Sequence, residues 1–375
     1  MLPSLVEKDI EDGIRSFIER EFPIATPGFK SGFERNKSVV DEFLEKRENF
    51  IKGPWLEIRR PFRKSTDDMH EVLPLLSGRC GIGLKPTPYQ HQLESFRRLR
   101  MPDGKPTIVA TGTGSGKTEC FLYPVLDYVL QALEKKQKGI KALIIYPMNA
   151  LATDQARRLV KLCFDIKKKT GILPSVGLFT GAPGEASSVM DEERLLCITD
   201  RNKLRKNPPD ILLTNYKMLD YLLLREEDRA WWKGTSNESL RYLMVDELHT
   251  FDGAQGTDLA CLIRRLRDFL GLGDELACVG TSATLGGENG IADLQKYASD
   301  VFGADFSDSA SIIREDRLSA GEYLSGFGER QALGVWPSKQ ALDALKSLPR
   351  DVEPVRFSTT AMRAWFPREL GTLVD

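Results

Sequence analysis

A glycine-rich stretch followed by lysine and threonine has the clearest chemical potential in this sequence. Positions 111 to 118 read TGTGSGKT, between the apolar runs TIVAT and CFLYP. Glycines let backbone N–H groups approach an anion closely, and the lysine and hydroxyl that follow can contact phosphate and Mg²⁺. The strict phosphate-loop pattern begins with glycine, where this chain has Thr111. The alternative interpretation is a glycine turn that only connects a strand to a helix.

We predict that this loop and the start of the next helix bind a nucleotide. Lys117 can reach the β- and γ-phosphates, and the Thr118 hydroxyl can ligate Mg²⁺. The helix that starts near Lys117 adds the positive end of its dipole. The predicted nucleotide-binding residues in this stretch are Thr111, Gly112, Thr113, Gly114, Ser115, Gly116, Lys117, Thr118 and Glu119.

Two adjacent carboxylates, Asp246 and Glu247, end the apolar run YLMVDE. At a strand end beside the loop, Asp246 can hold Mg²⁺ through water, and Glu247 can orient and deprotonate an attacking water. A small-molecule kinase does not need the second carboxylate, because its nucleophile belongs to the substrate. The pair therefore favours hydrolysis. Alternatively, the two carboxylates only cap the N-terminus of a helix.

The elements that must position these residues alternate along the chain. Short apolar runs rich in β-branched residues are separated by longer helical patterns, which predicts an α/β fold with a parallel sheet between helices. The predicted strands are 107–111, 142–147, 176–180, 210–215, 242–247 and 276–283, and the predicted helices are 117–134, 149–164, 216–225 and 255–270. The polar stretch 184–208 predicts a surface insertion with a helix around 190–204.

These patterns divide the chain into three expected parts. Residues 1–78 carry helical apolar spacings and a basic, proline-containing stretch, and we expect an N-terminal helical accessory segment there. The nucleotide-binding domain is expected over residues 79–300. Residues 301–375 are expected to form a mixed helical extension, because the strand signals weaken after residue 287.

Composition narrows the class of protein. The chain has 53 basic and 54 acidic residues, so any nucleic-acid surface must be a local patch and not a global field. Six scattered cysteines without a CxxC pair and only three histidines argue against a zinc site or a disulfide framework and favour a reducing cytoplasm. Neither a signal peptide nor a membrane-spanning run is recognisable, so we expect a cytoplasmic protein without a membrane partner.

Several motifs in a fixed order resemble those of the superfamily 2 helicases, the DEAD/DEAH-box-like motors. TGTGSGKT is followed by YPMNALATDQ, TNYKMLDYLL, DELH and GTSATLG, and the resemblance covers roughly residues 84–287. It implies a RecA-like domain that uses ATP and Mg²⁺. In this domain Lys117 and Thr118 would contact phosphates and metal, Asp246 would be the metal carboxylate, and Glu247 would be the general base.

The resemblance also implies roles around this centre. Ser282 and Thr284 match the motif that links nucleotide state to domain closure. His249 ends the Asp-Glu-x-His box, where such a histidine couples hydrolysis to nucleic acid; the alternative is a packing residue at a strand end. Upstream, KPTPYQHQLESF resembles the adenine-reading glutamine motif, with Gln92 preferred over Gln90. For either glutamine, the alternative is a surface residue that opens a helix.

The remaining motifs separate the helicase subfamilies. PMNALA and TNYKMLD stand where DEAD-box RNA helicases carry PTRELA and TPGR, and they resemble the Lhr/YprA-type group of large bacterial DNA helicases. Loops of this kind at the carboxyl ends of strands can follow phosphates without reading bases. The predicted nucleic-acid-binding residues are Pro147, Met148, Asn149, Gly181, Thr214 and Asn215. For Gly181, a plain loop is the alternative.

The resemblance implies an ATP-dependent helicase or translocase that acts on single-stranded or partly duplex DNA. Some members of the broader group belong to phage-defence systems, so genome defence or repair with partner proteins of a multi-gene system is the implied setting. An RNA helicase stays open, because phosphate contacts carry no sugar information. A nucleotide-binding scaffold that is not a motor also stays open. The sequence does not predict the oligomeric state.

One expected part of such a motor is not recognisable in the sequence. No second sheet and no arginine-rich motif of a second motor domain follow residue 287. We therefore expect the chain to be the N-terminal part of a longer helicase, and to hydrolyse ATP close to the background rate by itself.

Overall fold

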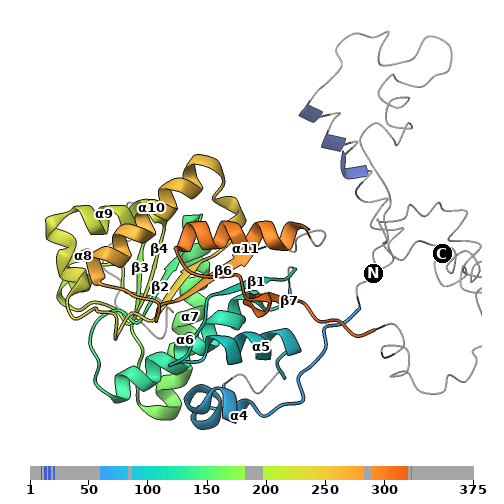
Figure 1. Cartoon of the computed structure of the whole chain (residues 1–375), viewed down its shortest axis with the longest axis horizontal. Helices are drawn as coiled ribbons and strands as arrows, with labels where there is room; N and C mark the ends of the chain where they lie inside the picture. Colours follow the sequence, from blue (N-terminus) through green and yellow to red (C-terminus); the bar gives the residue numbers. More distant parts are fainter. Residues whose placement is uncertain are drawn as a thin grey trace, which may run out of the picture. The chain divides into compact units, whose positions relative to one another are not determined.

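Seven parallel strands form one sheet in the order β3-β4-β2-β5-β6-β1-β7 (Figure 1). All six predicted strands are present, and each is fully buried. Their bounds, with that of the seventh, are β1 Thr107–Ala110, β2 Ala142–Ile145, β3 Val176–Phe179, β4 Ile211–Thr214, β5 Tyr242–Val245, β6 Ala277–Ser282 and β7 Ile312–Arg314. Burial on both faces explains why these segments are continuous apolar runs and do not alternate with polar residues.

This computed structural model describes residues 10, 12–14, 16–17, 20–21, 60–82, 87–112, 114–181, 197–282, 289–319 and 322. The chain divides into two compact units, Pro61–Leu318 and a second one made of Met1–Arg60 and Ser319–Asp375. Nearly all the described residues belong to Pro61–Leu318, which contains the whole sheet.

Helices cover both faces of the sheet (Figure 1). Alternate strand residues, such as Ile144 and Met244, face one hydrophobic cluster, while Leu143 and Val245 face the other. The first cluster is closed by α4 Met69–Val72, η2 Pro74–Arg79, α5 Gln90–Leu99, α6 Lys117–Glu134 and α7 Asn149–Thr170. The second is closed by α8 Arg201–Lys206, α9 Tyr216–Leu224, η3 Glu226–Trp232, η4 Leu248–Thr250, α10 Gly253–Leu270 and α11 Asn289–Phe302. The expected parallel α/β fold is therefore confirmed.

The predicted helices differ from the observed ones mainly at their ends. The helix predicted at 117–134 is α6, with the same bounds. The helix α9 ends one residue before its predicted end, and α10 ends at the predicted residue. The helix predicted at 149–164 continues to Thr170, where Gly171 in a left-handed conformation ends it. In the stretch 184–208, α8 begins only at Arg201, and residues 182–196 lie outside the described residues.

The unit extends beyond both boundaries expected from the sequence. On the N-terminal side, Asp127 of α6 accepts hydrogen bonds from the backbone N–H groups of Leu75 and Leu76, at 2.9 and 2.8 Å. Burial raises the pKa of this carboxyl, and the two N–H groups partly offset that rise. On the C-terminal side, the chain does not turn into helix alone after residue 300. After α11 and η5 Ser309–Ser311 it adds β7 to the edge of the sheet, beside β1.

The described helices include none that could cross a membrane, since none is both long and apolar enough.

Candidate functional site

The predicted catalytic residues meet at the carboxyl edge of the sheet because four neighbouring strands end in register. Val245 pairs with Gly280, so Asp246 and Glu247 follow β5 beside the end of β6. Ala110 pairs with Ser282 on one side and with Arg314 on the other. The phosphate loop after β1 therefore lies between the end of β6 and the end of β7, at the kind of edge where parallel α/β sheets bind ligands.

The polar side chains inside the phosphate loop hold the loop itself. Thr111 and Ser115 are fully buried, and their hydroxyl oxygens lie 2.7 Å apart. Ser115 donates in turn to the carbonyl of Gly112 at 2.7 Å, so Thr111 is the donor of the first contact. A threonine in place of the first glycine is accommodated by this internal hydrogen bond. Thr113 lies outside the described residues.

The glycines before α6 have backbone conformations that other residues rarely adopt. Gly114 and Gly116 have φ of 78° and 77°. A Cβ at Gly116 would also lie 2.2 Å from Nε2 of Gln92. The positive φ and the close approach of Gln92 both favour glycine at position 116, directly before α6. The first turn of α6 presents Thr118, which is half-buried, and Glu119, whose carboxylate pairs with Arg158 of α7.

Lys117 points across the edge of the sheet to the end of β5. Its Nζ lies 3.4 Å from Oε1 of Glu247 and 3.5 Å from the carbonyl oxygen of Ser282. The side chains of Lys117 and Glu247 are 15% and 30% exposed, so the pair is shielded but open to a ligand. A lysine in this position can bind a phosphate group close to the carboxylate of Glu247.

Asp246 lies deeper and shares a hydroxyl with its neighbour. The Thr281 side chain donates to Oδ1 of Asp246 and accepts from the backbone N–H of Glu247, the latter at 2.9 Å. Burial raises the pKa of Asp246, and the hydrogen bond from Thr281 partly offsets the rise. A carboxylate is a hard oxygen donor of the kind that Mg²⁺ prefers.

Glu247 has a strained backbone. Its φ of 49° and ψ of 50° are left-handed, which costs a residue with a side chain about 1–2 kcal/mol. Such conformations gather at functional sites. Here the left-handed residue lies two positions after the end of β5 and caps the start of the short helix η4, which carries His249. His249 Nδ1 lies 3.5 Å from Oε2 of Glu247 and 3.3 Å from Oγ of Ser282.

His249 therefore lies between the predicted base, Glu247, and the motif expected to couple nucleotide state to domain closure. Both contacts are present in one arrangement, and the role of the histidine stays a prediction. Its side chain is 40% exposed, which leaves it accessible from outside. Thr284, the other predicted coupling residue, lies outside the described residues.

The two glutamines considered for base recognition lie in different surroundings on α5. Gln92 is buried, accepts from the N–H of Tyr89 at 2.9 Å and donates to the carbonyl of Gly116 at 3.2 Å. Gln90 faces outward and donates to Glu94 at 3.3 Å. Only Gln92 contacts the phosphate loop, so it alone of the two is placed beside the predicted nucleotide site.

The predicted nucleic-acid residues line the same edge of the sheet, beyond β2 and β4. Asn215 Nδ2 donates to Oδ1 of Asn149 at 2.7 Å and to the carbonyl of Thr180 at 3.1 Å. The two asparagines thus join the starts of α7 and α9. Pro147 is half-buried and Met148 is 64% exposed at this rim.

Two of the predicted nucleic-acid-binding residues, Thr214 and Gly181, are in contact with other parts of the fold. Thr214 is fully buried, and its hydroxyl donates to the carbonyl of Phe179 at 2.7 Å, so the side chain does not reach the rim. Gly181 has φ of 76°, and a Cβ there would lie 2.5 Å from Sδ of Met218. Close packing against α9 is a sufficient reason for that glycine.

Three contributors to the site were absent from the sequence-based prediction. Thr281 joins the two carboxylates; its position directly before the SAT motif was an available signal. His91 is fully buried, and its Nε2 donates to the carbonyl of Ser115 at 2.9 Å. Burial lowers the pKa of His91, which keeps the ring neutral. Glu315 accepts from the N–H of Gly112, and nothing in the local sequence indicates it.

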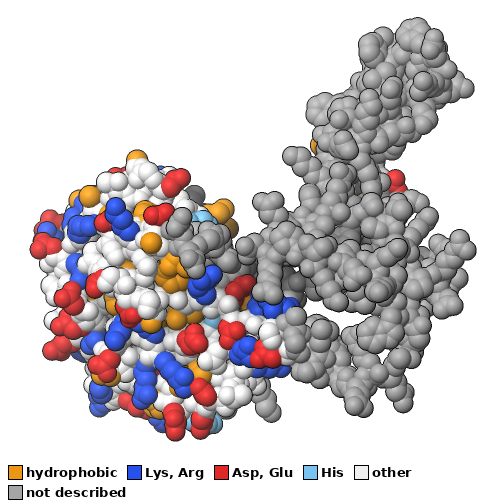
Figure 2. Space-filling model, turned by 45° about the vertical axis from the view of Figure 1, so that its right-hand side comes forward, with side chains coloured by type: hydrophobic (Ala, Val, Ile, Leu, Met, Phe, Trp, Pro, Cys, Tyr) orange, Lys and Arg blue, Asp and Glu red, His pale blue; other side chains and the backbone are white. Residues whose placement is uncertain are grey.

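Charges of both signs are mixed on the part of the surface that Figure 2 draws. On the face drawn in Figure 2, Lys and Arg are interspersed with Asp and Glu over the described unit. Arg264 and Arg265, the arginines that follow the Asp-Glu pair, are occupied elsewhere: Arg264 donates to the carbonyl of Asp300 at 2.7 Å, and Arg265 pairs with Asp220. The expectation that they point away from the nucleotide site agrees with these contacts.

Comparison with known proteins extends the motif pattern. The model of the DEAD/DEAH box helicase family matches residues 89–290, more than half of the chain. Among curated proteins, the chain is similar to the Druantia protein DruE of Escherichia coli (strain UMEA 4076-1), at 28% identity, with 79% of this chain and 21% of that protein covered. It is also similar to the uncharacterized ATP-dependent helicase YprA of Bacillus subtilis (strain 168), at 30% identity, with 67% and 30% covered.

A solved structure has a similar arrangement over much of the chain. The crystal structure of the DUF1998 helicase MrfA bound to DNA and AMPPNP is 23% identical, with a TM-score of 0.49, and the match covers 73% of this chain and 33% of that one. This chain therefore spans from about a fifth to a third of the length of these three proteins.

Proposed function

Because the chain belongs to the DEAD/DEAH box helicase family, we propose that it forms the ATP- and Mg²⁺-binding part of a motor that moves along DNA. One observation carries the proposal: Lys117, Glu247 and Asp246 meet at the edge of the sheet, although about half the described unit separates them in sequence. A phosphate-binding lysine, a base and a metal carboxylate in one place are what the hydrolysis of a nucleotide requires.

Each residue has a distinct proposed task. The loop and Lys117 bind the β- and γ-phosphates, while Gln92 recognises adenine from α5. Thr118 and Asp246 would hold Mg²⁺, which supplies positive charge to the phosphate oxygens. Glu247 orients water and accepts its proton on a carboxylate oxygen. A scaffold that only binds nucleotide has no use for such a base. Strained backbone is typical of functional sites, so the conformation of Glu247 also supports turnover.

The nucleic-acid track is proposed along the rim formed by Pro147, Met148, Asn149 and Asn215. The Asn149 amide and the starts of α7 and α9 offer hydrogen-bond donors to phosphates without reading bases. Both N–H groups of the Asn215 amide are engaged with Asn149 and Thr180, so Asn215 holds Asn149 in place. His249 would report occupancy of the track to Glu247.

DNA is the proposed substrate, single-stranded or partly duplex. The support is the resemblance of PMNALA and TNYKMLD to the Lhr/YprA-type group, which the similarity to YprA strengthens. A role in defence or repair with partner proteins, in the cytoplasm, is proposed on the same resemblance and on the similarity to DruE.

ATP turnover by a protein that carries this chain and a second motor domain tests the proposal. We expect single-stranded DNA to raise the rate well above that without nucleic acid, and RNA of the same sequence to raise it less. A clear preference for RNA would show that RNA, and not DNA, is the substrate. Tight ATP binding with no stimulation by either polymer would instead support the scaffold.

A further inference from the structure

A carboxylate from the far end of the unit contacts the backbone of the phosphate loop. Oε2 of Glu315 accepts a hydrogen bond from the N–H of Gly112 at 3.1 Å, although 203 positions separate the two residues in the sequence. The Glu315 side chain is 23% exposed, so water competes little for this contact. A hydrogen bond to an ionised acceptor is among the stronger ones in proteins.

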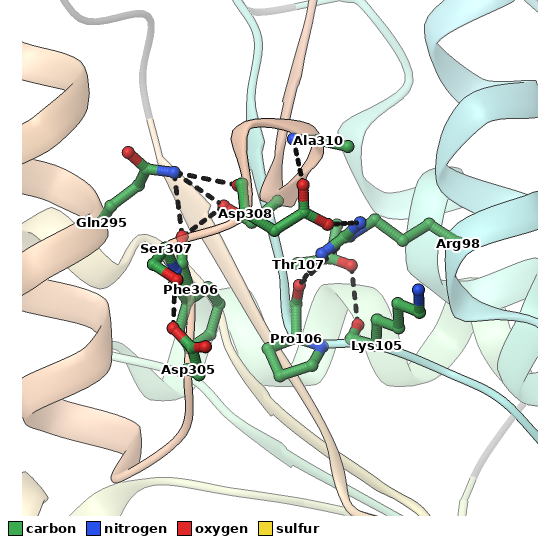
Figure 3. Close-up of polar contacts among 11 residues, drawn as sticks. Arg98, Lys105, Pro106, Thr107, Gln295, Asp305, Phe306, Ser307, Asp308 and Ala310 are labelled. Atoms are coloured by element: carbon green, nitrogen blue, oxygen red, sulfur yellow. Dashed lines mark hydrogen bonds and ion pairs between the residues drawn. The ribbon is translucent and has the colours of Figure 1, made fainter.

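Glu315 reaches the loop because β7 is held at its start as well as along its length. Before β7, Asp308 pairs with Arg98 of α5 at 2.7 Å, and Arg98 also donates to the carbonyl of Pro106, directly before β1 (Figure 3). Gln295 of α11 donates to the carbonyls of Phe306 and Asp308 (Figure 3). With its start fixed against β1 and Arg314 in register with Ala110, β7 delivers Glu315 beside the loop.

The residues after Glu315 join the two ends of the unit. The N–H of Arg63 donates to the carbonyl of Asp316 at 2.9 Å, and the N–H of Leu318 donates to the carbonyl of Pro61 at 3.1 Å. The side chains of Arg63 and Asp316 also pair at 3.0 Å. We name these two short segments, residues 61–63 and 316–318, the terminal clasp. It is formed where the chain enters and leaves the unit.

The terminal clasp contacts the phosphate loop by two routes. Arg317 pairs with Glu315 at 2.8 Å, and its guanidinium lies 4.0 Å from the centre of the Phe62 ring. Phe62 in turn packs edge-on against His91, whose Nε2 donates to the carbonyl of Ser115. The first route ends at the N–H of Gly112, at the start of the loop. The second ends at the carbonyl of Ser115, near the end of the loop.

We propose that Glu315 is a positioning residue for the phosphate loop and ties nucleotide binding to the terminal clasp. The proposal rests on the proposed binding of ATP by this loop. If the Glu315 contact favours the binding-competent loop, then bound nucleotide must favour the contact by the same factor. Residues 316–318 of the terminal clasp thereby respond to the nucleotide.

Titration of the 375-residue chain with a fluorescent ATP analogue and Mg²⁺ tests the positioning role. Glu315→Ala should raise the dissociation constant about tenfold, because a charged hydrogen bond to the loop is lost. Glu315→Gln keeps an acceptor oxygen and should lie closer to the wild type. Glu134→Ala is the matched control: it loses an ion pair with Arg79 at the end of α6 that is remote from the loop, and should bind within about twofold of the wild type. Circular dichroism checks that each variant is folded.

Hydrogen exchange on the wild-type chain tests the connection without any substitution. Saturating ATP and Mg²⁺ should slow exchange at Gly112 and at residues 316–318, and Glu315→Ala should lose the second effect. Equal affinity of Glu315→Ala and wild type, or unchanged exchange at 316–318 with nucleotide bound, would overturn the proposal. If the wild-type chain binds no nucleotide, the proposed function fails instead.

Discussion

Nζ of Lys117 lies 3.4 Å from Oε1 of Glu247. The two side chains come from opposite sides of β6, Lys117 from the helix after β1 and Glu247 from the end of β5. A phosphate bound by the lysine would therefore lie next to the carboxylate that is proposed to activate water. The distance places the proposed phosphate-binding group beside the proposed base, and each can be tested by its own substitution.

Lys117→Ala should weaken ATP binding strongly and leave the fold intact. The lysine places a positive charge beside Glu247, and loss of a charge-assisted contact to phosphate weakens binding by about 10- to 100-fold. Isothermal titration calorimetry with ATP and Mg²⁺ measures the change. Lys135→Ala, at the exposed end of the same helix, is the control. Unchanged affinity in folded Lys117→Ala would refute the assignment of the loop.

Glu247→Gln should bind ATP and DNA but stop turnover in a protein that includes a second motor domain. The amide keeps the shape of the side chain but cannot accept the proton of water, so the rate should fall by about 10²–10⁴. Parallel measurements of nucleotide affinity, DNA affinity and phosphate release separate binding from chemistry. Turnover close to that of the wild type would show that another group is the base.

The 375-residue chain alone should bind nucleotide yet hydrolyse it near the background rate. An arginine that neutralises the transferring phosphate contributes about 10³–10⁵ in rate where one is used. Arg264 and Arg265 are engaged with α11 and α9, and neither contacts the described part of the phosphate loop. Single-stranded DNA should bind weakly, because affinity scales with the number of phosphates neutralised.

Phosphate release measured over a range of protein concentrations checks this expectation. DNA-stimulated turnover that is independent of concentration would reveal a catalytic surface that the described residues do not include. A rate per molecule that rises steeply with concentration would indicate an arginine supplied by a second copy of the chain.

Acidification should destabilise the unit through His91. Burial holds the pKa of this histidine below its ordinary value of 6.5, so the unfolded chain takes up the proton first. Stability is therefore complete above the unfolded pKa and falls as the pH drops from about 6.5 towards the folded pKa. Thermal unfolding at about pH 7.5 and about pH 5.5 should show a larger drop for wild type than for His91→Gln, whose amide can still donate to Ser115. Equal drops would contradict the role of His91.

Much of the site follows from the sequence alone. The six buried strands are continuous apolar runs, and the loop and the Asp-Glu pair stand directly after two of them, so the carboxyl edge of one parallel sheet had to gather them. The local sequence was sufficient because each of these residues belongs to a recognisable motif that directly follows a strand of the sheet. The helix α6 was predicted with its observed ends for the same reason, since the loop glycines mark its start.

Only the tertiary structure decided the contacts between distant segments and the direction of single side chains. The strand β7 has three residues, too few for any period, and it forms because β1 offers an unpaired edge. Its pairing brings Glu315 to Gly112, a neighbour that no local pattern indicates. The hydroxyl of Thr214 turns inward to Phe179 and leaves Asn215 at the rim, because a buried hydroxyl needs a hydrogen-bond partner and the adjacent strand supplies one.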